Sequence, residues 1–295
     1  MSSSRSSEKE PITRRRFLTA TALGAAGLGL YSGEFERHHL EITYPEVRLP
    51  NLPPVFDGFR MAQLSDIHLD MFTEPYFLRD IVARINRLRP DAVFLTGDFV
   101  THQWLPHKYP IHAAWACARI LDGIECTRRY AILGNHDVVV SAQAVTAALT
   151  ASRIHVLRNS FAPLELGASR LWLAGLDDPV EGHPDLDQAI PEFLRDRADQ
   201  PVLLMCHAPD YADTVLAHPA GKSVAFMLSG HTHGGQIRAP FLGPMVLPDL
   251  GKKYVEGLFQ LQGMQLYVNR GLGTVGVPVR FNCPPELTCI TLRRA

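Results

Sequence analysis

The sequence predicts an α/β fold in which two β-sheets stack against each other and helices cover their outer faces. Three observations lead to this prediction. Strand-like apolar runs alternate with amphipathic helical segments in the first half of the body, the second half is richer in strand-like runs, and polar clusters follow the ends of several predicted strands. Such alternation implies right-handed βαβ crossovers and a mostly parallel inner sheet.

The elements of the first half follow a Pro-rich connector, which contains a predicted edge strand at 39–44. The helix at 75–88 is the clearest of them, because its apolar residues recur at helical spacing from Phe77 to Leu88. The sequence predicts further helices at 111–121 and 138–151, and strands at 59–65, 91–96 and 130–133.

The second half contains mostly strand-like runs and one predicted helix near 186–197. The strands are predicted at 154–157, 163–166, 171–174, 202–206, 224–228, 254–259, 264–268 and 287–292. The sequence shows no internal repeat and no linker that would divide this body. It therefore predicts one domain over 59–295, preceded by a connector over 33–58 and an N-terminal segment over 1–32.

The composition excludes some classes of function. The chain has 295 residues, 46% of them hydrophobic, which is enough for a sizeable core. Lys and Arg total 29 against 30 Asp and Glu, so no nucleic-acid partner is expected. The five cysteines form no C-x-x-C pair, which argues against a redox motif or a structural zinc site. Cys283 and Cys289 fit either a disulfide or burial as small apolar residues.

The N-terminus has the layout of a targeting segment. Three arginines, Arg14 to Arg16, precede an apolar stretch over 17–31, and the run TRRRFL at 13–18 resembles the twin-arginine export consensus of bacteria. The stretch is short for a membrane span, which needs about 20 apolar residues. No clear cleavage site follows it, so a cleaved signal and a retained anchor both stay open. We expect a protein exported across, or anchored to, the bacterial cytoplasmic membrane, on its periplasmic or extracytoplasmic face.

Five predicted strands each end in a polar cluster that holds carboxylate, amide or imidazole groups. Along the chain these are Asp66 and His68 after AQLS, Asp98 after AVFLT, Asn135 and His136 after YAIL, His207 after VLLMC, and His231 and His233 after AFMLS. Ligands in open α/β sheets bind outside the carboxyl ends of strands, so we expect the five clusters to converge on one crevice.

These side chains are typical ligands of divalent metal ions, which accept this mixture of carboxylate, carbonyl and imidazole without thiolate. Alternation along a strand puts Asp66 and His68 on the same side, so both can reach one ion. Seven ligands are too many for one zinc ion and suit two ions that share a carboxylate. Taken singly, Gly97-Asp98 is also typical of a turn, and residues 135–137 are also typical of a helix N-terminus.

In the order D-x-H, G-D, G-N-H-D, H and G-H-T-H, these motifs resemble those of the calcineurin-like metallophosphoesterases, and the resemblance runs from about Phe59 to the C-terminus. The motif GHTHGGQ, with LYVNRGLG at 266–273, is more narrowly similar to a bacterial exported or membrane-associated branch of that family. The resemblance implies a four-layer αββα sandwich, two mixed β-sheets flanked by helices, with two metal ions. It also implies the residue roles: Asp66, His68 and His233 hold the first metal, Asn135, His207 and His231 hold the second, Asp98 bridges them, and His136 is a catalytic histidine that binds no metal.

The resemblance further implies a hydrolase of phosphate esters, acting as a phosphodiesterase, phosphatase or pyrophosphatase, in which a metal-activated water attacks phosphorus in line. We expect His136 to donate a proton to the leaving oxygen or to stabilise the transition state. The two divalent ions are Mn, Fe, Zn or Co, all of which accept N and O ligands. The segment after Asp98 lacks the aspartate and arginine of protein Ser/Thr phosphatases, and Thr101 replaces the tyrosine of purple acid phosphatases. Neither a phosphoprotein substrate nor a ferric-tyrosinate centre is therefore expected.

The resemblance allows small-molecule, lipid-linked or nucleotide-linked phosphate esters of the cell envelope, with membrane association through the N-terminus and the twin-arginine export machinery as a partner. The apolar run at 241–248 either rims the site or packs on the body as a stiff loop. The alternative functions are a non-catalytic metal-binding recognition module, which the intact ligand set disfavours, and a nuclease, which the absence of a basic groove disfavours.

Overall fold

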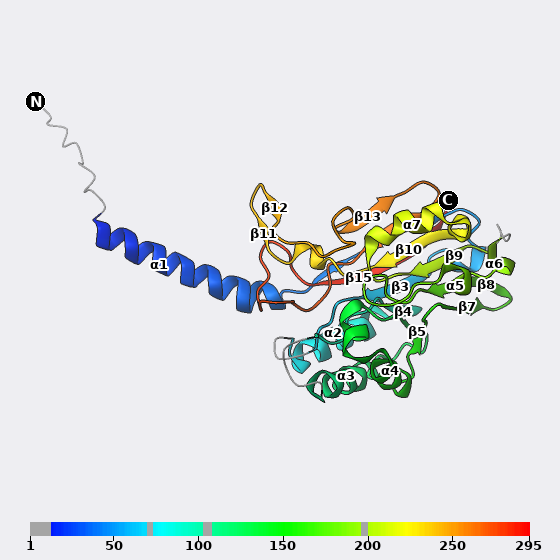
Figure 1. Ribbon diagram of the computed structural model, residues 1–295, viewed down its shortest axis with the longest axis horizontal. Helices are drawn as coiled ribbons and strands as arrows, with labels where there is room; N and C mark the ends of the chain where they lie inside the picture. The colour runs from blue at the N-terminus through cyan, green and yellow to red at the C-terminus, as the bar shows by residue number, and fades with distance from the viewer. Residues whose placement is uncertain (1–12, 70–72, 103–107, 196–199) are drawn as a thin grey trace, which may run out of the picture.

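The computed structural model describes residues 13–69, 73–102, 108–195 and 200–295. Its body consists of two stacked β-sheets with helices on both outer faces, and helix α1 (Arg14–Leu30) projects from one end of this body (Figure 1). The predicted four-layer αββα sandwich is therefore confirmed.

The first sheet has the strand order β1-β15-β3-β4-β5-β6, and β2 pairs with β15. Its strands are β1 (Glu41–Thr43), β2 (Glu46–Leu49), β3 (Arg60–Leu64), β4 (Ala92–Leu95), β5 (Arg129–Ala131), β6 (His155–Val156) and β15 (Glu286–Arg294). Strands β3 to β6 are parallel, as predicted, whereas β15 runs antiparallel to β3. The sheet is therefore mixed, and its C-terminal strand lies beside its first long strand.

The second sheet has the order β13-β14-β10-β9-β8-β7. Its strands are β7 (Ser160–Leu166), β8 (Ser169–Gly175), β9 (Val202–Met205), β10 (Val224–Ser229), β13 (Gly257–Gln260) and β14 (Gln265–Val268). The four inner strands are parallel, and each edge strand is antiparallel to its neighbour. A separate short hairpin is formed by β11 (Arg238–Ala239) and β12 (Gly243–Pro244).

Three apolar clusters hold the four layers together. The first joins the outer face of the first sheet to α2 (Pro75–Leu88), α3 (Lys108–Leu121) and α4 (Asn135–Ala151). The third joins the second sheet to α5 (Leu186–Ala189), α6 (Glu192–Arg195) and α7 (Ala212–Ala217). The second cluster fills the space between the two sheets. Strand β4 contributes to it and to the first cluster, because Val93 and Leu95 face the helices while Ala92 and Phe94 face the other sheet.

Some elements differ from their predictions. The helix predicted at 138–151 begins at Asn135, because Gly134 is its N-cap and the Asp137 side chain accepts a hydrogen bond from the Gly134 N–H at 3.1 Å. The helix predicted near 186–197 is two short helices, since Pro191 between them cannot donate a backbone hydrogen bond. Residues 196 and 197 of that prediction lie outside the described residues. Strand β2 and helix α7 were not predicted, because both are too short to show a period.

Helix α1 is exposed along its whole length and continues in a π-helical turn, Tyr31–Phe35, that packs on the body. The Ser32 carbonyl accepts a hydrogen bond from the Arg280 N–H at 3.0 Å, and the Glu36 carboxylate accepts one from the Cys283 N–H at 2.7 Å. Within the described residues, no helix combines the length and apolar character needed to cross a bilayer.

All five cysteines are free, and Cys283 and Cys289 are buried. Of the two alternatives for this pair, the structure shows burial as small apolar residues. Burial also raises the pKa of the Cys206 and Cys283 thiols, which keeps them protonated and unreactive.

Candidate metal centre

The polar clusters after five strands meet at one edge of the two sheets. Strands β3, β4 and β5 are parallel in the first sheet, and β9 and β10 are parallel in the second, so each set presents its carboxyl ends on one side. The structure brings six of the seven predicted ligands into two groups, and the seventh, Asn135, lines the same cavity as His136.

Asp66, His68 and His233 form the first group, in which one ligand atom of each lies within 4.8 Å of the others. The Nε2 atoms of His68 and His233 are 3.2 Å apart, and His233 Nε2 is 3.5 Å from Asp66 Oδ1. All three side chains are buried. Three buried donor atoms that converge from two loops, one after β3 and one after β10, are the arrangement that one divalent ion requires.

Asp98, His207 and His231 form the second group by the same distance criterion. Asp98 Oδ2 lies 3.2 Å from His207 Nε2 and 3.5 Å from Nε2 of His68, which belongs to the first group. Asp98 therefore connects the second group to the first, in the position that a carboxylate shared by two ions would occupy.

Hydrogen bonds outside the two groups fix which ring nitrogen faces the centre. His207 Nδ1 donates to the Thr96 carbonyl at 2.7 Å, and His231 Nε2 donates to the Asp249 carbonyl at 2.8 Å. A carbonyl oxygen only accepts, so these nitrogens carry the proton of the neutral ring, and the other nitrogen of each ring is the one that can bind a metal ion. His207 Nε2 and Asn135 Oδ1 are buried without a hydrogen-bond partner among the described residues. Because buried polar atoms are rarely left unpartnered, these residues fit a role as metal ligands.

Burial keeps most of these imidazoles neutral. It lowers the pKa of His68 to about 3 and that of His231 to about 4, and it also lowers the pKa of His233. Burial alone would lower the pKa of His207 too, but the Asp98 carboxylate raises it well above its usual value. Neutral imidazole is the form that binds metal, and an ion held beside Asp98 would replace the proton of His207.

Five of the seven predicted ligands have a left-handed backbone, which residues other than glycine rarely adopt. The φ angles are 51° for Asp66, 47° for His68, 56° for Asp98, 72° for His231 and 52° for His233. Such positions cost about 1–3 kcal/mol each and persist where surrounding contacts hold them. Here the His68 N–H donates to the Asp98 carbonyl at 3.0 Å, and the Asp66 carboxylate accepts from the His231 N–H at 2.9 Å. Three ligand loops are thus tied to one another.

Glycines allow these loops to approach closely, and Gly230 gives a test. A Cβ atom at Gly230 would overlap Ser65 Oγ and Asp66 Oδ2. We expect Gly230→Ala to lower the free energy of unfolding by about 1–3 kcal/mol, as overpacking does, and to lower metal content. Thermal unfolding followed by circular dichroism would measure the first effect. The matched control is Gly33→Ala, whose Cβ would lie 3.8 Å from its nearest neighbours. Equal melting temperatures for the two variants would show that close packing behind Asp66 is not required.

His136 lies in the first turn of α4, where one hydrogen bond holds its backbone and another holds its ring. Its own N–H donates to Asp98 Oδ1 at 2.9 Å, and its Nδ1 accepts a hydrogen bond from the His102 N–H at 3.0 Å. Since Nδ1 accepts, Nε2 carries the proton of the neutral ring. His136 also lies within ligand distance of His68 and Asp98. Its available nitrogen is nevertheless a donor, which suits hydrogen bonding to an oxygen atom.

Sequence reasoning missed three residues that support the centre. The Thr101 hydroxyl is 3.0 Å from His68 Nδ1, and the fully buried Asp137 carboxylate accepts hydrogen bonds from the Phe99 and Gly134 N–H groups. Arg280, also fully buried, donates to the carbonyls of residues 270, 271, 273 and 283. For Asp137 the signal was its place in the GNHD motif, whereas nothing in the local sequence marks Arg280.

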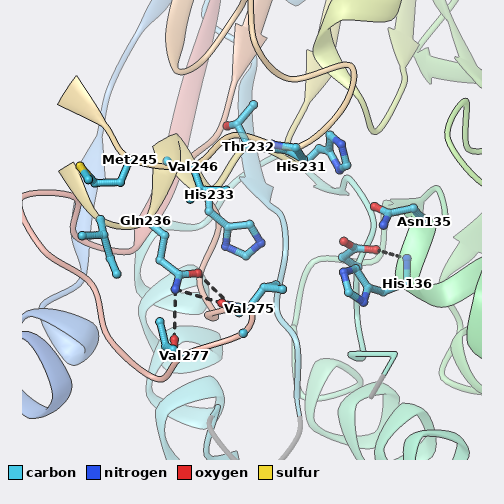
Figure 2. A pocket seen from close by; sticks show the side chains of 15 residues that line it. Asn135, His136, His231, Thr232, His233, Gln236, Met245, Val246, Val275 and Val277 are labelled. Carbon is cyan, nitrogen blue, oxygen red and sulfur yellow. Dashed lines mark hydrogen bonds between the residues drawn. The ribbon is translucent and has the colours of Figure 1, made fainter. Parts of the chain in front are cut away.

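A cavity of about 340 Å³ opens over the two groups. In Figure 2, Asn135 and His136 face His231 and His233 across it, while Met245, Val246, Val275 and Val277 lie farther along its wall. One end of the cavity is therefore built from donor atoms and the other from apolar side chains.

Comparison with known proteins identifies the family to which this arrangement of residues belongs. The model of the calcineurin-like phosphoesterase family matches residues 59–235. The chain is 36% identical over 292 residues to the metallophosphoesterase YkuE of Bacillus subtilis, covering 96% of this chain and 98% of that protein. It is 30% identical over 288 residues to the phosphodiesterase YaeI of Escherichia coli, covering 95% and 99% of the two chains.

Among solved structures, the NAD nucleotidase NadN of Haemophilus influenzae shares the fold, with a TM-score of 0.50 and 14% identity. The match covers 72% of this chain and 45% of that longer chain. With the family model covering more than half of its length and two relatives matching nearly all of it, this chain belongs to the calcineurin-like phosphoesterase family and is a phosphoester hydrolase.

Proposed function

We propose that this protein hydrolyses phosphate diesters with two divalent metal ions and that its substrate is a lipid-linked or nucleotide-linked ester of the cell envelope. The observation that supports a centre of two metal ions is the position of Asp98, which lies close to His68 of the first group and to His207 of the second. Asp66, His68 and His233 would hold the first ion, and Asn135, His207 and His231 the second. Asp98 would bridge the two ions.

When bound, two such ions neutralise the phosphoryl oxygens and lower the pKa of a water molecule that attacks phosphorus. The residues of the chain supply the remaining functions. The ligand loops fix the two groups in place before substrate arrives. His136 lines the cavity beside Asp98, and its Nε2 carries the proton of the neutral ring because Nδ1 accepts from the His102 N–H. A protonated imidazole nitrogen at that position would donate to the leaving oxygen of the ester.

Two observations support a diester with an apolar part. The relative YaeI is named a phosphodiesterase. The wall of the cavity away from the donors is apolar, formed by Ile237, Met245, Val246, Val275 and Val277. A phosphate held at the donor end would leave its substituent against this wall, which favours an apolar substituent over a charged one.

We also propose export by the twin-arginine route, supported by the arginines that open the exposed apolar helix α1. Replacing both Arg14 and Arg15 with lysine should leave the protein in the cytoplasmic fraction, whereas Arg16→Lys should not. Fractionation of cells followed by immunoblotting measures this. Normal export of the double variant would exclude the twin-arginine route.

The experiment that tests the proposed function uses the full chain in detergent. Elemental analysis should find about two metal ions per chain after loading with Mn²⁺, and bis(p-nitrophenyl) phosphate should be hydrolysed faster than p-nitrophenyl phosphate. Two bound ions without hydrolysis of either ester or of pyrophosphate would indicate a recognition module. No bound metal under any loading condition would contradict the proposed centre.

Thr101 provides a separate test of the first metal site. Its hydroxyl lies 3.0 Å from Nδ1 of His68, and by accepting the Nδ1 proton it would leave Nε2 free for the ion. We expect Thr101→Val to weaken metal binding by about 10–100-fold, as the loss of such supporting partners usually does. Thr101→Ser keeps the hydroxyl and should bind metal like the native protein. Competition with a chelator gives the affinities, and equal values for valine and serine would refute the assignment.

A further inference from the structure

The hairpin formed by β11 and β12 exposes an unusual amount of apolar surface at one end of the molecule. Phe241 is 107% exposed and Leu242 is 80% exposed, and Met245 and Val246 beside them are also exposed. Val277, on a neighbouring loop, is half-exposed. We call Phe241, Leu242, Met245, Val246 and Val277 the apolar rim. Soluble monomeric proteins seldom gather such side chains in one exposed patch without a partner for them.

The apolar rim is held in its exposed position by backbone contacts. The Met245 N–H donates to the Ile237 carbonyl at 3.0 Å, and the Arg238 N–H donates to the Phe281 carbonyl at 2.9 Å. Arg238 also pairs with Glu256 at the base of the hairpin. Three prolines at 240, 244 and 248 further restrict this segment. These contacts at the base of the hairpin hold its apolar tip away from the core.

The apolar rim is continuous with the segment from which helix α1 projects. The Gln236 side chain donates to the Val277 carbonyl at 3.0 Å, which joins the hairpin to the loop at 275–281. That loop in turn contacts the turn after α1, since Phe281 lies edge-on to Tyr31 with ring centroids 6.5 Å apart. Figure 1 shows α1 and the hairpin at the same end of the molecule. Three segments far apart in the sequence thus form one apolar end.

The charges on this end favour a membrane over a protein partner. The sequence has no ionisable side chain at 239–248 or at 271–279. Arg238 is paired, and Arg280 is buried. The basic groups are instead Arg14, Arg15 and Arg16, which are exposed at the start of α1, the end of that helix farthest from the body (Figure 1). The exposed apolar side chains of Phe17, Leu23 and Leu30 follow them along the helix. An apolar surface beside a basic and apolar helix has the chemistry that binds anionic phospholipids.

The cavity over the metal centre opens at this same end. Met245, Val246 and Val277 belong to the apolar rim and also line the cavity, which reaches Asp98 and His136 at its other end (Figure 2). A phosphoester entering past the rim would therefore bring its phosphate to the donor end while its apolar part stayed near the rim.

We propose that the apolar rim docks into the boundary between headgroups and acyl chains of a lipid bilayer, beside α1, so that the cavity faces the membrane. With the proposed function, on which this second part rests, the substrate is then a phosphodiester that the bilayer itself presents. The docking requires only the rim and α1, and it is testable without turnover.

Docking is tested with a tryptophan placed in the full chain at Phe241 and with vesicles of phosphatidylcholine and phosphatidylglycerol, with and without bromines on the acyl chains. We expect the emission of Phe241→Trp, corrected for the native tryptophans, to shift to shorter wavelength and to be quenched by the bromines. The control is Phe193→Trp on α6, an exposed position at the opposite end of the molecule (Figure 1), which should not be quenched. An unquenched tryptophan at 241 on vesicle-bound protein, or no vesicle binding, would overturn the proposal. A dimer in analytical sedimentation would also overturn it if the emission of the tryptophan at 241 were shifted to shorter wavelength without lipid. The apolar rim would then be covered by a second copy of the chain.

The consequence for activity is tested with the double variant Phe241→Ser, Leu242→Ser, neither of which lines the cavity. We expect hydrolysis of a phosphodiester lipid in vesicles to fall by at least about tenfold, since burial of one large apolar side chain is worth that much. Hydrolysis of bis(p-nitrophenyl) phosphate in solution should not change, and Phe193→Ser should change neither. If the bromines quenched the tryptophan at 241 but the protein hydrolysed no ester, the docking proposal would stand and the proposed function would be refuted. If the protein hydrolysed the soluble diester, and the native and double-variant chains hydrolysed the vesicle lipid at equal rates, docking would have no role in activity.

Discussion

Replacing Asp98 with asparagine should lower the turnover number for a phosphodiester by about 10³-fold, at the upper end of the loss expected when one essential electrostatic group is removed from an active site. Asp98 Oδ2 lies 3.2 Å from His207 Nε2 and 3.5 Å from His68 Nε2, so its negative charge acts on both groups of donors. Burial would raise the pKa of Asp98, but His207 and His136 lower it well below the usual value, which keeps it ionised. An amide keeps the shape but removes this charge.

Turnover and metal content of Asp98→Asn should be measured together. We expect the metal content to fall as well, because a neutral amide bridges two cations poorly. Asp122→Asn is the matched control, since Asp122 pairs with Arg129 and Arg153 near the surface, away from the centre. If Asp98→Asn kept both ions and lost less than tenfold in turnover, Asp98 would not be the bridging ligand.

His136→Ala should retain both metal ions and lose about 10²–10⁴-fold in turnover, the usual contribution of a general acid or base. The His102 N–H occupies Nδ1 of His136, so the ring offers a proton at Nε2 rather than a lone pair. The loss should therefore appear in the turnover number and not in metal content. Steady-state kinetics with elemental analysis separates the two.

The control for His136→Ala is His112→Ala, which removes an exposed histidine on α3. His136 lies within ligand distance of His68 and Asp98, so loss of one ion from the alanine variant would make it a ligand instead of a proton donor. A loss of turnover below tenfold with both ions in place would rule out either catalytic role.

The sequence predicted most of the fold because its signals are local. Helix α2 has the predicted bounds, since its apolar residues repeat at helical spacing and Pro75 starts it. The position of β15 between β1 and β3 could not be predicted, because the pairing of Thr288 with Gln63 joins residues far apart in the chain. Local pattern shows that a segment is a strand but does not show which strand it will pair with.

The convergence of the polar clusters was predictable for a similar reason. Parallel strands end on the same side of a sheet, so the order of D-x-H, G-D, G-N-H-D, H and G-H-T-H was enough to place these clusters together. The supporting residues were not predictable in the same way. Thr101 and Arg280 act through side-chain geometry that depends on the finished fold, and the contact of Arg280 with carbonyls of residues 270–273 arises from a loop conformation.

The left-handed backbone at five predicted ligands has a consequence for the stability of the whole protein. A chain optimised only for resistance to heat would carry glycine at these positions, because glycine adopts positive φ without the penalty that other residues incur. Aspartate and histidine there lower the free energy of unfolding, and a ligand that binds the folded state alone raises it again. The metal-loaded protein should therefore melt at a higher temperature than the metal-free one, and cellular metal supply would set how long the folded protein lasts.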